Sequence, residues 1–280
     1  VVKEFEQRFK VRVEVSVVSS DDVLWQKVST ANGKYDVVAA NTVEIGRYIA
    51  QDRLLPLNLQ RIPNITLQRK RFANLRKIPG ITQNNAVYAV PYTYAEMGLI
   101  YDRKQLPKPP DSIAALWDPR LKGKVLAFDG SSHNFSLAAL HLRQAPFRIE
   151  DKAFNALARD LIALRRNVLT FYSLPDESVD LFRKHGIALM FANYGRQQLK
   201  PLQDAGLDVG YVIPREGALA WLDCWAVLRG AKNPALAEDW INYMLEPTVS
   251  ERLTQRQGLA NTISAVAESD DAHFLWLQAV

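Results

Sequence analysis

The chain has 280 residues, 48% of them hydrophobic and 23% charged, so it can bury a large core and fold without disulfide or metal cross-links. Its formal net charge of +5 comes from 35 basic and 30 acidic residues that are interspersed, which excludes long disordered segments and a broad basic surface. The densest basic cluster lies at residues 68–77 and is interpreted as a solvated helix face. We therefore expect no nucleic-acid partner.

Cysteine and histidine usage argues against a disulfide or a metal site. Cys224 is the single cysteine, and the four histidines, at positions 133, 141, 185 and 273, lack metal-ligand spacing. No metal or other cofactor is predicted. No apolar run approaches the roughly 18 residues that a membrane-spanning helix requires. Because residue 1 already lies in a predicted helix, we expect any export signal to be removed or to lie outside this sequence.

The first forty residues alternate between helical and strand periodicity. Apolar residues at helical spacing predict a helix over residues 1–9, and valines at every second position predict a strand over 11–17. A helix is predicted to begin near residue 20, and a short buried strand follows over 35–40. Strands that alternate with helices favour an α/β fold with a mostly parallel sheet.

Asn41 and Thr42 follow the strand at 35–40, where the next helix begins. Ligands of open α/β sheets bind at the carboxyl ends of strands, which makes both residues candidate ligand contacts. The alternative is that they only cap the helix.

The next part of the chain is basic and punctuated by prolines over residues 53–80, a pattern that predicts a surface excursion. Strands are predicted over 86–90 and 97–101, and a second α/β series follows a proline-rich break, with strands over 124–129, 168–172, 187–191 and 209–214. Two lobes are therefore predicted. Lobe 1 comprises residues 1–102 and 216–280, and lobe 2, which is inserted between them, comprises residues 103–215.

Residues 217–227 place an aromatic side chain and a carboxylate close together. On a strand, Trp221, Asp223 and Trp225 share one face. A carboxylate beside an indole ring can bind an organic ammonium group through its charge and a cation–π contact. The alternative is an ordinary core strand in which Asp223 is hydrogen-bonded at the end of the element.

In its order of features the chain resembles the type II periplasmic solute-binding proteins of ABC transporters, and within them the spermidine/putrescine-binding group. Six segments carry this resemblance over nearly the whole chain: 36–42 (DVVAANT), 90–101 (VPYTYAEMGLIY), 116–125 (LWDPRLKGKV), 187–193 (IALMFAN), 214–223 (PREGALAWLD) and 231–234 (AKNP). The resemblance implies a two-lobed α/β fold, each lobe a mostly parallel sheet flanked by helices, with two hinge crossings. It also implies an exported, periplasmic and monomeric protein that traps a polyamine or a related small organic cation by hinge closure, and a membrane permease as its partner.

The resemblance assigns ligand contacts residue by residue. Trp221 and Asp223 match the family's aromatic and carboxylate after the second crossing. Phe191 stands where the family usually has a tryptophan, and Ser173 where it has a serine. Where polyamine binders carry acidic residues, this chain has only Asp129, displaced by one position. The predicted ligand-binding set is Trp221, Asp223, Phe191, Ser173, Asn41, Thr42, Tyr92, Tyr94, Asp129, Ser131 and His133.

A count of carboxylates narrows the ligand. A polyamine needs about one acidic partner for each ammonium group, because an uncompensated buried charge costs several kcal/mol. Asp223 is the one clear match, which favours a smaller cation or a single amine over spermidine itself, with the polyamine class as the nearest label. The family's first strand has no counterpart after residue 1, so we expect either that the natural chain extends upstream or that lobe 1 lacks this strand.

Two other functions use a related fold. Thiaminase-like enzymes have a cleft cysteine, and Cys224 adjoins Asp223, but strand alternation directs Cys224 to the opposite face and favours a buried structural thiol. A ligand-sensing domain of a larger regulator would use the same cleft to signal, and the sequence leaves this alternative open. Because no nucleophile–base pattern or phosphate-binding glycine loop is found, the protein is predicted to bind rather than to catalyse.

Overall fold

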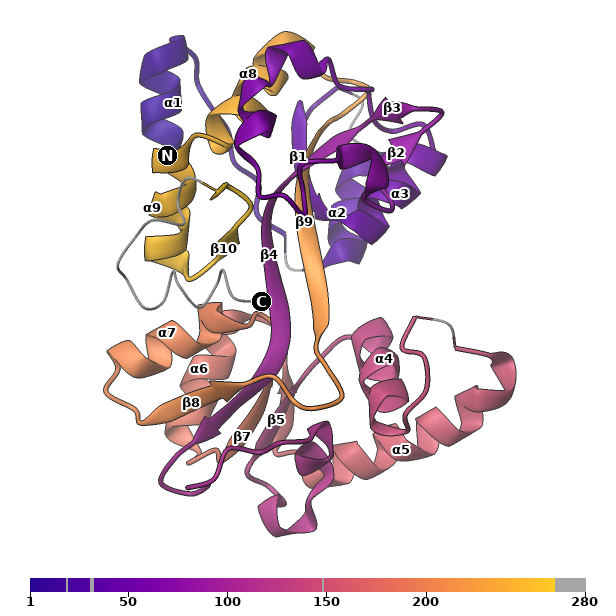
Figure 1. Ribbon diagram of the computed structural model, residues 1–280, viewed down its shortest axis with the longest axis vertical. Helices are drawn as coiled ribbons and strands as arrows, with labels where there is room; N and C mark the ends of the chain where they lie inside the picture. The colour runs from indigo at the N-terminus through magenta and orange to yellow at the C-terminus, as the bar shows by residue number, and fades with distance from the viewer. Residues whose placement is uncertain (19, 31–32, 148, 265–280) are drawn as a thin grey trace. The chain divides into compact units, whose positions relative to one another are not determined.

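The computed structural model describes residues 1–18, 20–30, 33–147 and 149–264. The chain divides into two compact units: Val1–Tyr94 with Trp221–Val280 form unit 1, and Ala95–Ala220 form unit 2. The chain passes between the units twice. The first passage lies within strand β4 (Ala89–Asp102) and the second within strand β9 (Leu219–Val227) (Figure 1).

Unit 1 is built on antiparallel strand pairs. Strand β1 (Val37–Asn41) pairs with β9, and strand β10 (Ala260–Asn261) pairs with the first part of β4. The sequence predicted a mostly parallel sheet, which is wrong for these pairs because β9 and β10 come from distant parts of the chain and enter the sheet in the opposite direction. The helices of unit 1 are α1 (Val2–Phe9), α2 (Asp21–Ser29), α3 (Thr42–Ala50), α8 (Pro234–Met244) and α9 (Pro247–Gln257).

The predicted strand over residues 11–17 is not formed. Its valines do alternate, but Val15 and Val17 are 65% and 86% exposed. Residues 11–16 and β1 line a cavity of about 530 Å³ together with Trp225 and Trp240. An alternating pattern becomes a strand only when a neighbouring strand supplies hydrogen bonds, and the described part of the chain places no strand beside these valines.

The predicted surface excursion over residues 53–80 is instead part of the core of unit 1. It forms three short 3₁₀ helices, η1 (Leu59–Arg61), η2 (Pro63–Leu67) and η3 (Leu75–Lys77). Between and within them, buried side chains join the main apolar cluster: Leu54, Ile62, Phe72, Leu75 and Ile78. The basic stretch at 68–77 is therefore not an exposed face of one α-helix. The prediction failed because the sequence of this stretch has no clear periodicity, so it did not show which apolar residues are buried.

Strand β4 is longer than predicted. After the short hairpin of β2 (Thr82–Gln83) and β3 (Ala86–Val87), it runs unbroken through Pro91 for 14 residues. Proline lacks a backbone N–H, but its carbonyl still accepts, here from the side chains of Gln68 at 2.6 Å and Thr262 at 3.0 Å. These contacts hold the strand together where the sequence suggested a break.

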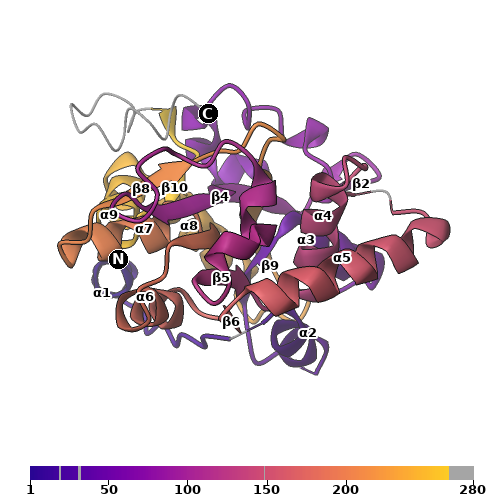
Figure 2. The ribbon, with the colours of Figure 1, turned by 90° about the horizontal axis from the view of Figure 1, so that it is seen from below.

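Unit 2 contains the parallel strands that the sequence predicted. Strand β5 (Val125–Phe128) pairs in parallel with β6 (Thr170–Tyr172) and with β7 (Leu189–Ala192). The second part of β4 pairs antiparallel with β7 and with β8 (Val209–Val212). The helices of unit 2 are α4 (Ser131–His141), α5 (Phe154–Asn167), α6 (Pro175–Lys184) and α7 (Arg196–Asp204), accompanied by η4 (Ile113–Trp117), η5 (Pro119–Leu121) and η6 (Asp151–Ala153). Helices α4 and α5 lie side by side around Ala138, Ala139 and Leu157 (Figure 2).

Candidate functional site

In unit 1, the ends of β1 and β9 bring two predicted ligand contacts together. Asn41 and Asp223 are opposite each other in the antiparallel register of these strands. Directly opposite residues project to the same face with Cβ atoms about 4.5–5.5 Å apart. Tyr92 also lies nearby, since burial and then the charge of Asp223 raise the pKa of its hydroxyl. Asn41, Tyr92 and Asp223, all members of the predicted set, therefore lie close together in unit 1.

The carboxylate of Asp223 has no cation beside it in the part of the chain that the structure describes. Its side chain is partly exposed, and its pKa is raised to about 7, first by burial and then by the negative charge of Asp21. No positive charge or hydrogen bond among the described residues lowers that pKa. A group held in this state gains stability when a cation is placed against it.

The raised pKa of Asp223 makes the stability of the unliganded protein depend on pH. The folded protein holds the proton of Asp223 up to about pH 7, whereas an unfolded aspartate loses it near pH 4. The contribution of protonated Asp223 to the free energy of unfolding is therefore present at low pH and is lost as the pH rises from about 4 to about 7. For a partly exposed group we expect a loss of about 2 kcal/mol in the free energy of unfolding between pH 4.5 and pH 8. Urea unfolding of wild type and Asp223→Asn checks this, and parallel pH profiles of the two proteins would contradict it.

Asn41 is the N-cap of α3, as one interpretation of the sequence predicted. Its Oδ1 accepts from the backbone N–H groups of Val43 at 3.0 Å and Glu44 at 3.1 Å. Its Nδ2 donates to Asp21 Oδ2 at 3.1 Å. Thr42 begins α3, and Gly80 approaches its carbonyl so closely that a Cβ at Gly80 would lie 2.3 Å from that oxygen. Asn41 is thus confirmed as the helix cap, whereas Thr42 is the first residue of the helix, and a ligand contact of either residue stays a prediction.

Trp221 and Tyr94 occupy different surroundings within unit 1. Trp221 is partly buried on β9. Tyr94 is 5% exposed, with its ring 5.3 Å from that of Phe72 and the guanidinium of Arg71 5.1 Å above it. The ring of Tyr94 thus packs against Phe72 and Arg71 within unit 1.

In unit 2, predicted contacts gather at the carboxyl ends of the parallel strands. Asp129 directly follows β5 and Ser173 directly follows β6, and both are exposed. Tyr194, two residues beyond β7, donates its hydroxyl to the Ser173 carbonyl at 2.7 Å and so connects two of these loops. Its ring stands perpendicular to that of Phe128, with centroids 5.7 Å apart. The result is an aromatic and polar surface at the expected end of the strands.

Phe128 and Tyr194 were absent from the predicted set. The sequence did hold a signal for both residues, since each lies at or just beyond the end of a predicted strand. Placing them together also requires the order of the strands in the sheet, which a local sequence pattern does not give. Phe191, which was in the set, is 1% exposed, and its carbonyl accepts from Tyr172 Oη at 2.6 Å. The structure therefore places Phe191 in the core of unit 2.

The loop between β5 and α4 holds the remaining candidates. The ring of His133 meets that of Phe128 edge to face, with centroids 5.1 Å apart. Ser131 is the first residue of α4, and its side chain lies outside what the structure describes.

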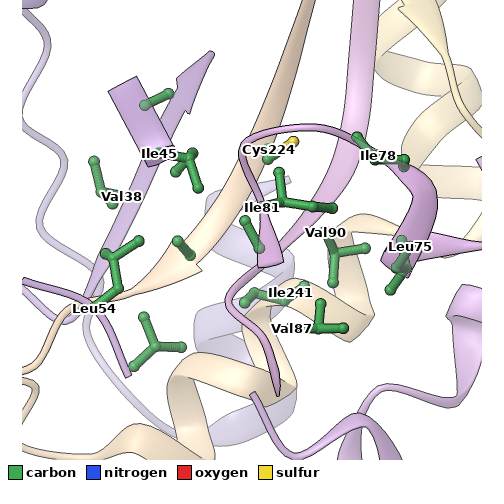
Figure 3. Packing of buried hydrophobic residues seen from close by; sticks show 14 of the residues in the cluster. Val38, Ile45, Leu54, Leu75, Ile78, Ile81, Val87, Val90, Cys224 and Ile241 are labelled. Atoms are coloured by element: carbon green, nitrogen blue, oxygen red, sulfur yellow. The ribbon is translucent and has the colours of Figure 1, made fainter. Parts of the chain in front are cut away.

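Cys224 lies in the apolar core of unit 1, on the face predicted by strand alternation. It is fully buried, and Figure 3 shows it among Ile78, Ile81 and Val90. Burial, followed by the charge of Asp223, raises the pKa of its thiol well above the ordinary value. The thiolate that a nucleophilic mechanism needs is therefore disfavoured.

The burial of Cys224 predicts slow alkylation. We expect iodoacetamide at pH 7.5 to leave the folded protein unlabelled for hours and to label it within minutes in 6 M guanidinium chloride, as intact-mass spectrometry would record. Rapid labelling of the folded protein, at a rate near that of free cysteine, would contradict the buried position.

Two further features, a cluster of metal-ligating side chains and a membrane-spanning helix, are absent from the part of the chain that the structure describes. That part of the chain contains no group of three or more histidine, cysteine, aspartate or glutamate side chains arranged to hold a metal ion. None of its helices combines the length and the apolar character needed to cross a membrane.

Comparison with known proteins gives consistent relatives. A family model of bacterial extracellular solute-binding proteins matches residues 1–275. Spermidine/putrescine-binding periplasmic protein 1 of Haemophilus influenzae is 26% identical over 254 residues, covering 90% of this chain and 68% of the relative. The spermidine/putrescine-binding periplasmic protein of Escherichia coli K12 is 24% identical over 259 residues, covering 92% and 72%.

Solved structures share the fold. The spermidine/putrescine ABC transporter substrate-binding protein PotD from Streptococcus pneumoniae is similar with a TM-score of 0.80 and 20% identity, covering 98% of this chain and 82% of that one. The Atu4243-GABA receptor is similar with a TM-score of 0.79 and 17% identity, covering 99% and 81%. The predicted resemblance and its fold are thereby confirmed, and the chain belongs to the family of bacterial extracellular solute-binding proteins.

Proposed function

We propose that this protein is the solute-binding component of an ABC importer and that it binds a polyamine or a related small organic cation. The observation that carries the proposal is Asp223, a carboxylate with no cationic partner in the described structure and a pKa raised to about 7. An organic ammonium group supplies the missing charge, and the nearby ring of Tyr92 offers it an aromatic contact.

The names of the relatives support the same ligand class. Two of them are spermidine/putrescine-binding periplasmic proteins, and one solved neighbour is the substrate-binding protein of a spermidine/putrescine ABC transporter. By analogy, this protein acts after export, in the periplasm, as a monomer that delivers its ligand to a membrane permease. The buried and weakly acidic thiol of Cys224 supports binding rather than catalysis.

The proposed mechanism is hinge closure. Strands β4 and β9 are the two segments that run from one unit into the other, so they are the places where a change in backbone angles would move the units. Residues 1–102 with 216–280 and residues 103–215 remain our proposed lobes. A ligand that contacts both lobes would favour their closed arrangement, which a permease would then recognise.

A thermal-shift screen tests the proposal. The panel is putrescine, spermidine, γ-aminobutyrate, choline, thiamine and, as a neutral control, 1,4-butanediol. A ligand at 100 times its dissociation constant stabilises the folded protein by about 2.7 kcal/mol, which gives a clear rise in melting temperature. We expect putrescine or spermidine to produce this rise and 1,4-butanediol to produce none. A rise with thiamine alone, or with no cation in the panel, would contradict the proposed ligand class.

A further inference from the structure

Among the described residues, the carboxylates near Asp223 outnumber the cations near them. Asp21 and Glu44 lie in the same region of unit 1, since the charge of Asp21 raises the pKa of both Asp223 and Glu44, in each case after the effect of burial. The one arginine among these side chains is Arg47, whose Nη1 is 3.6 Å from Glu44 Oε2. Among the described residues, one guanidinium therefore acts on this group of carboxylates, and the charge of Asp22 also raises the pKa of Glu44.

Asp21 is held toward Asp223 by defined contacts. It is the first residue of α2, whose N-cap is Ser20, and its Oδ2 accepts from Asn41 Nδ2 at 3.1 Å. Asn41 is in turn the cross-strand partner of Asp223. Because Asn41 Oδ1 is occupied in capping α3, its amide orientation is fixed and its donor side is directed to Asp21. A single asparagine thus connects the two carboxylate-bearing elements.

Glu44 gives an independent sign that the region is short of positive charge. It is 9% exposed, and its Oε2 has no hydrogen-bond partner among the described residues. Arg47 is too distant for a hydrogen bond to that oxygen, and its guanidinium stacks 3.8 Å from the ring centre of Trp25. Arg47 therefore offsets about one negative charge, and within the described part of the chain no ion pair offsets the charges of Asp21 and Asp223.

We propose that Asp21 is a ligand-contacting residue that determines specificity: together with Asp223 it selects ligands with two cationic nitrogens over ligands with one. This inference rests on the proposed function and adds a residue that the sequence analysis did not include. A single-amine ligand was favoured because the sequence showed one clear carboxylate, Asp223. With Asp21, unit 1 offers two acidic groups, which suits a ligand with two ammonium groups. Asp21 is exposed, so a ligand can reach it.

The test compares two amines of equal chain length. Putrescine has four carbons and two ammonium groups, and n-butylamine has the same four carbons and one. Dissociation constants for both are measured by isothermal titration calorimetry at pH 8 on wild type, Asp21→Asn and Asp22→Asn. Asp22 is the matched control, because it is the next residue in the first turn of α2, is also exposed and loses the same charge.

We expect Asp21→Asn to weaken putrescine binding by about tenfold or more and n-butylamine binding by less than about threefold. Asp22→Asn is expected to change both affinities by less than about threefold, and Asp21→Glu, which retains the charge, to recover part of the preference for putrescine. An asparagine at position 21 can still accept from Asn41, so melting temperatures should be close to that of wild type.

Two results would overturn the inference. One is a putrescine-to-butylamine preference that is unchanged in Asp21→Asn, and the other is an equal loss in Asp21→Asn and Asp22→Asn, which would indicate a general field effect. If wild type bound neither these amines nor spermidine, the proposed function itself would fail. The remaining possibility is that these carboxylates bind a metal cation, and a calcium titration of wild type and Asp21→Asn tests it. If wild type bound calcium but no amine, and Asp21→Asn abolished the calcium binding, the amine assignment would also be overturned.

Discussion

Asp223→Asn is expected to weaken the binding of putrescine or spermidine by at least about a hundredfold at pH 8 while the protein stays folded. The variant keeps the shape of the side chain and removes the charge, so a bound ammonium group would be desolvated without its partner, at a cost of several kcal/mol. Isothermal titration calorimetry measures the loss. Because the folded protein no longer carries an unpaired carboxylate, the unliganded variant should be at least as stable as wild type at this pH.

The control for this prediction is Asp22→Asn, which removes one charge from an exposed position in the same unit. It should retain nearly the wild-type affinity. If Asp223→Asn bound polyamines with wild-type affinity, the cation site would have to lie elsewhere in the chain.

Gly98→Ala is expected to destabilise unit 2 by about 3 kcal/mol. A Cβ at this position would lie 2.5 Å from Tyr211 Cζ, 2.6 Å from its hydroxyl oxygen and 2.8 Å from the carbonyl oxygen of Val212. The Tyr211 hydroxyl accepts from the backbone N–H of Gly98 at 2.9 Å and donates to the Glu96 carbonyl at 2.7 Å. The methyl group would therefore displace the ring and break both hydrogen bonds, as urea unfolding followed by circular dichroism would record.

Gly46→Ala is the matched control, because Gly46 lies within α3 and the nearest atoms to an added Cβ, those of Gly80, are at 3.5 Å, an ordinary contact distance. Alanine is the better helix former by about 0.8–1 kcal/mol, so this variant should gain a little stability. A Gly98→Ala protein as stable as wild type would show that Tyr211 can move aside without loss, which contradicts close packing along β4.

Local sequence patterns predicted the elements better than their pairing. On β9, Trp221 and Asp223 were predicted to share one face and Cys224 to lie on the other, and the thiol is indeed buried in the core. The same kind of alternation at residues 11–17 failed, because strand formation depends on a neighbour that a local pattern does not reveal. Likewise two separate strands were predicted over 86–90 and 97–101, but β4 runs on through Pro91, where the side chains of Gln68 and Thr262, distant in sequence, support it.

The sequence predicted those site residues whose own chemistry suggests ligand binding. It missed those that can be assigned to the site only from their position beside other residues in the fold. Asp223 could be selected from its own chemistry and from the family resemblance. Asp21 looked like an ordinary helix-start residue, and its relation to Asp223 depends on the pairing of Asn41 with a residue 182 positions away in the chain. Tyr194 could be placed next to Ser173 only with the order of β6 and β7 in hand.

Titration calorimetry of wild type with putrescine at pH 8 and at pH 5.5 tests most directly whether an ionised Asp223 holds a cationic ligand. At pH 5.5 the carboxyl group of the unliganded protein is mostly protonated, so the ligand must displace a proton before it can bind. We expect saturable binding with one site at pH 8 and an affinity about tenfold or more lower at pH 5.5. Affinity that is equal at the two pH values, or no binding at either, would contradict it.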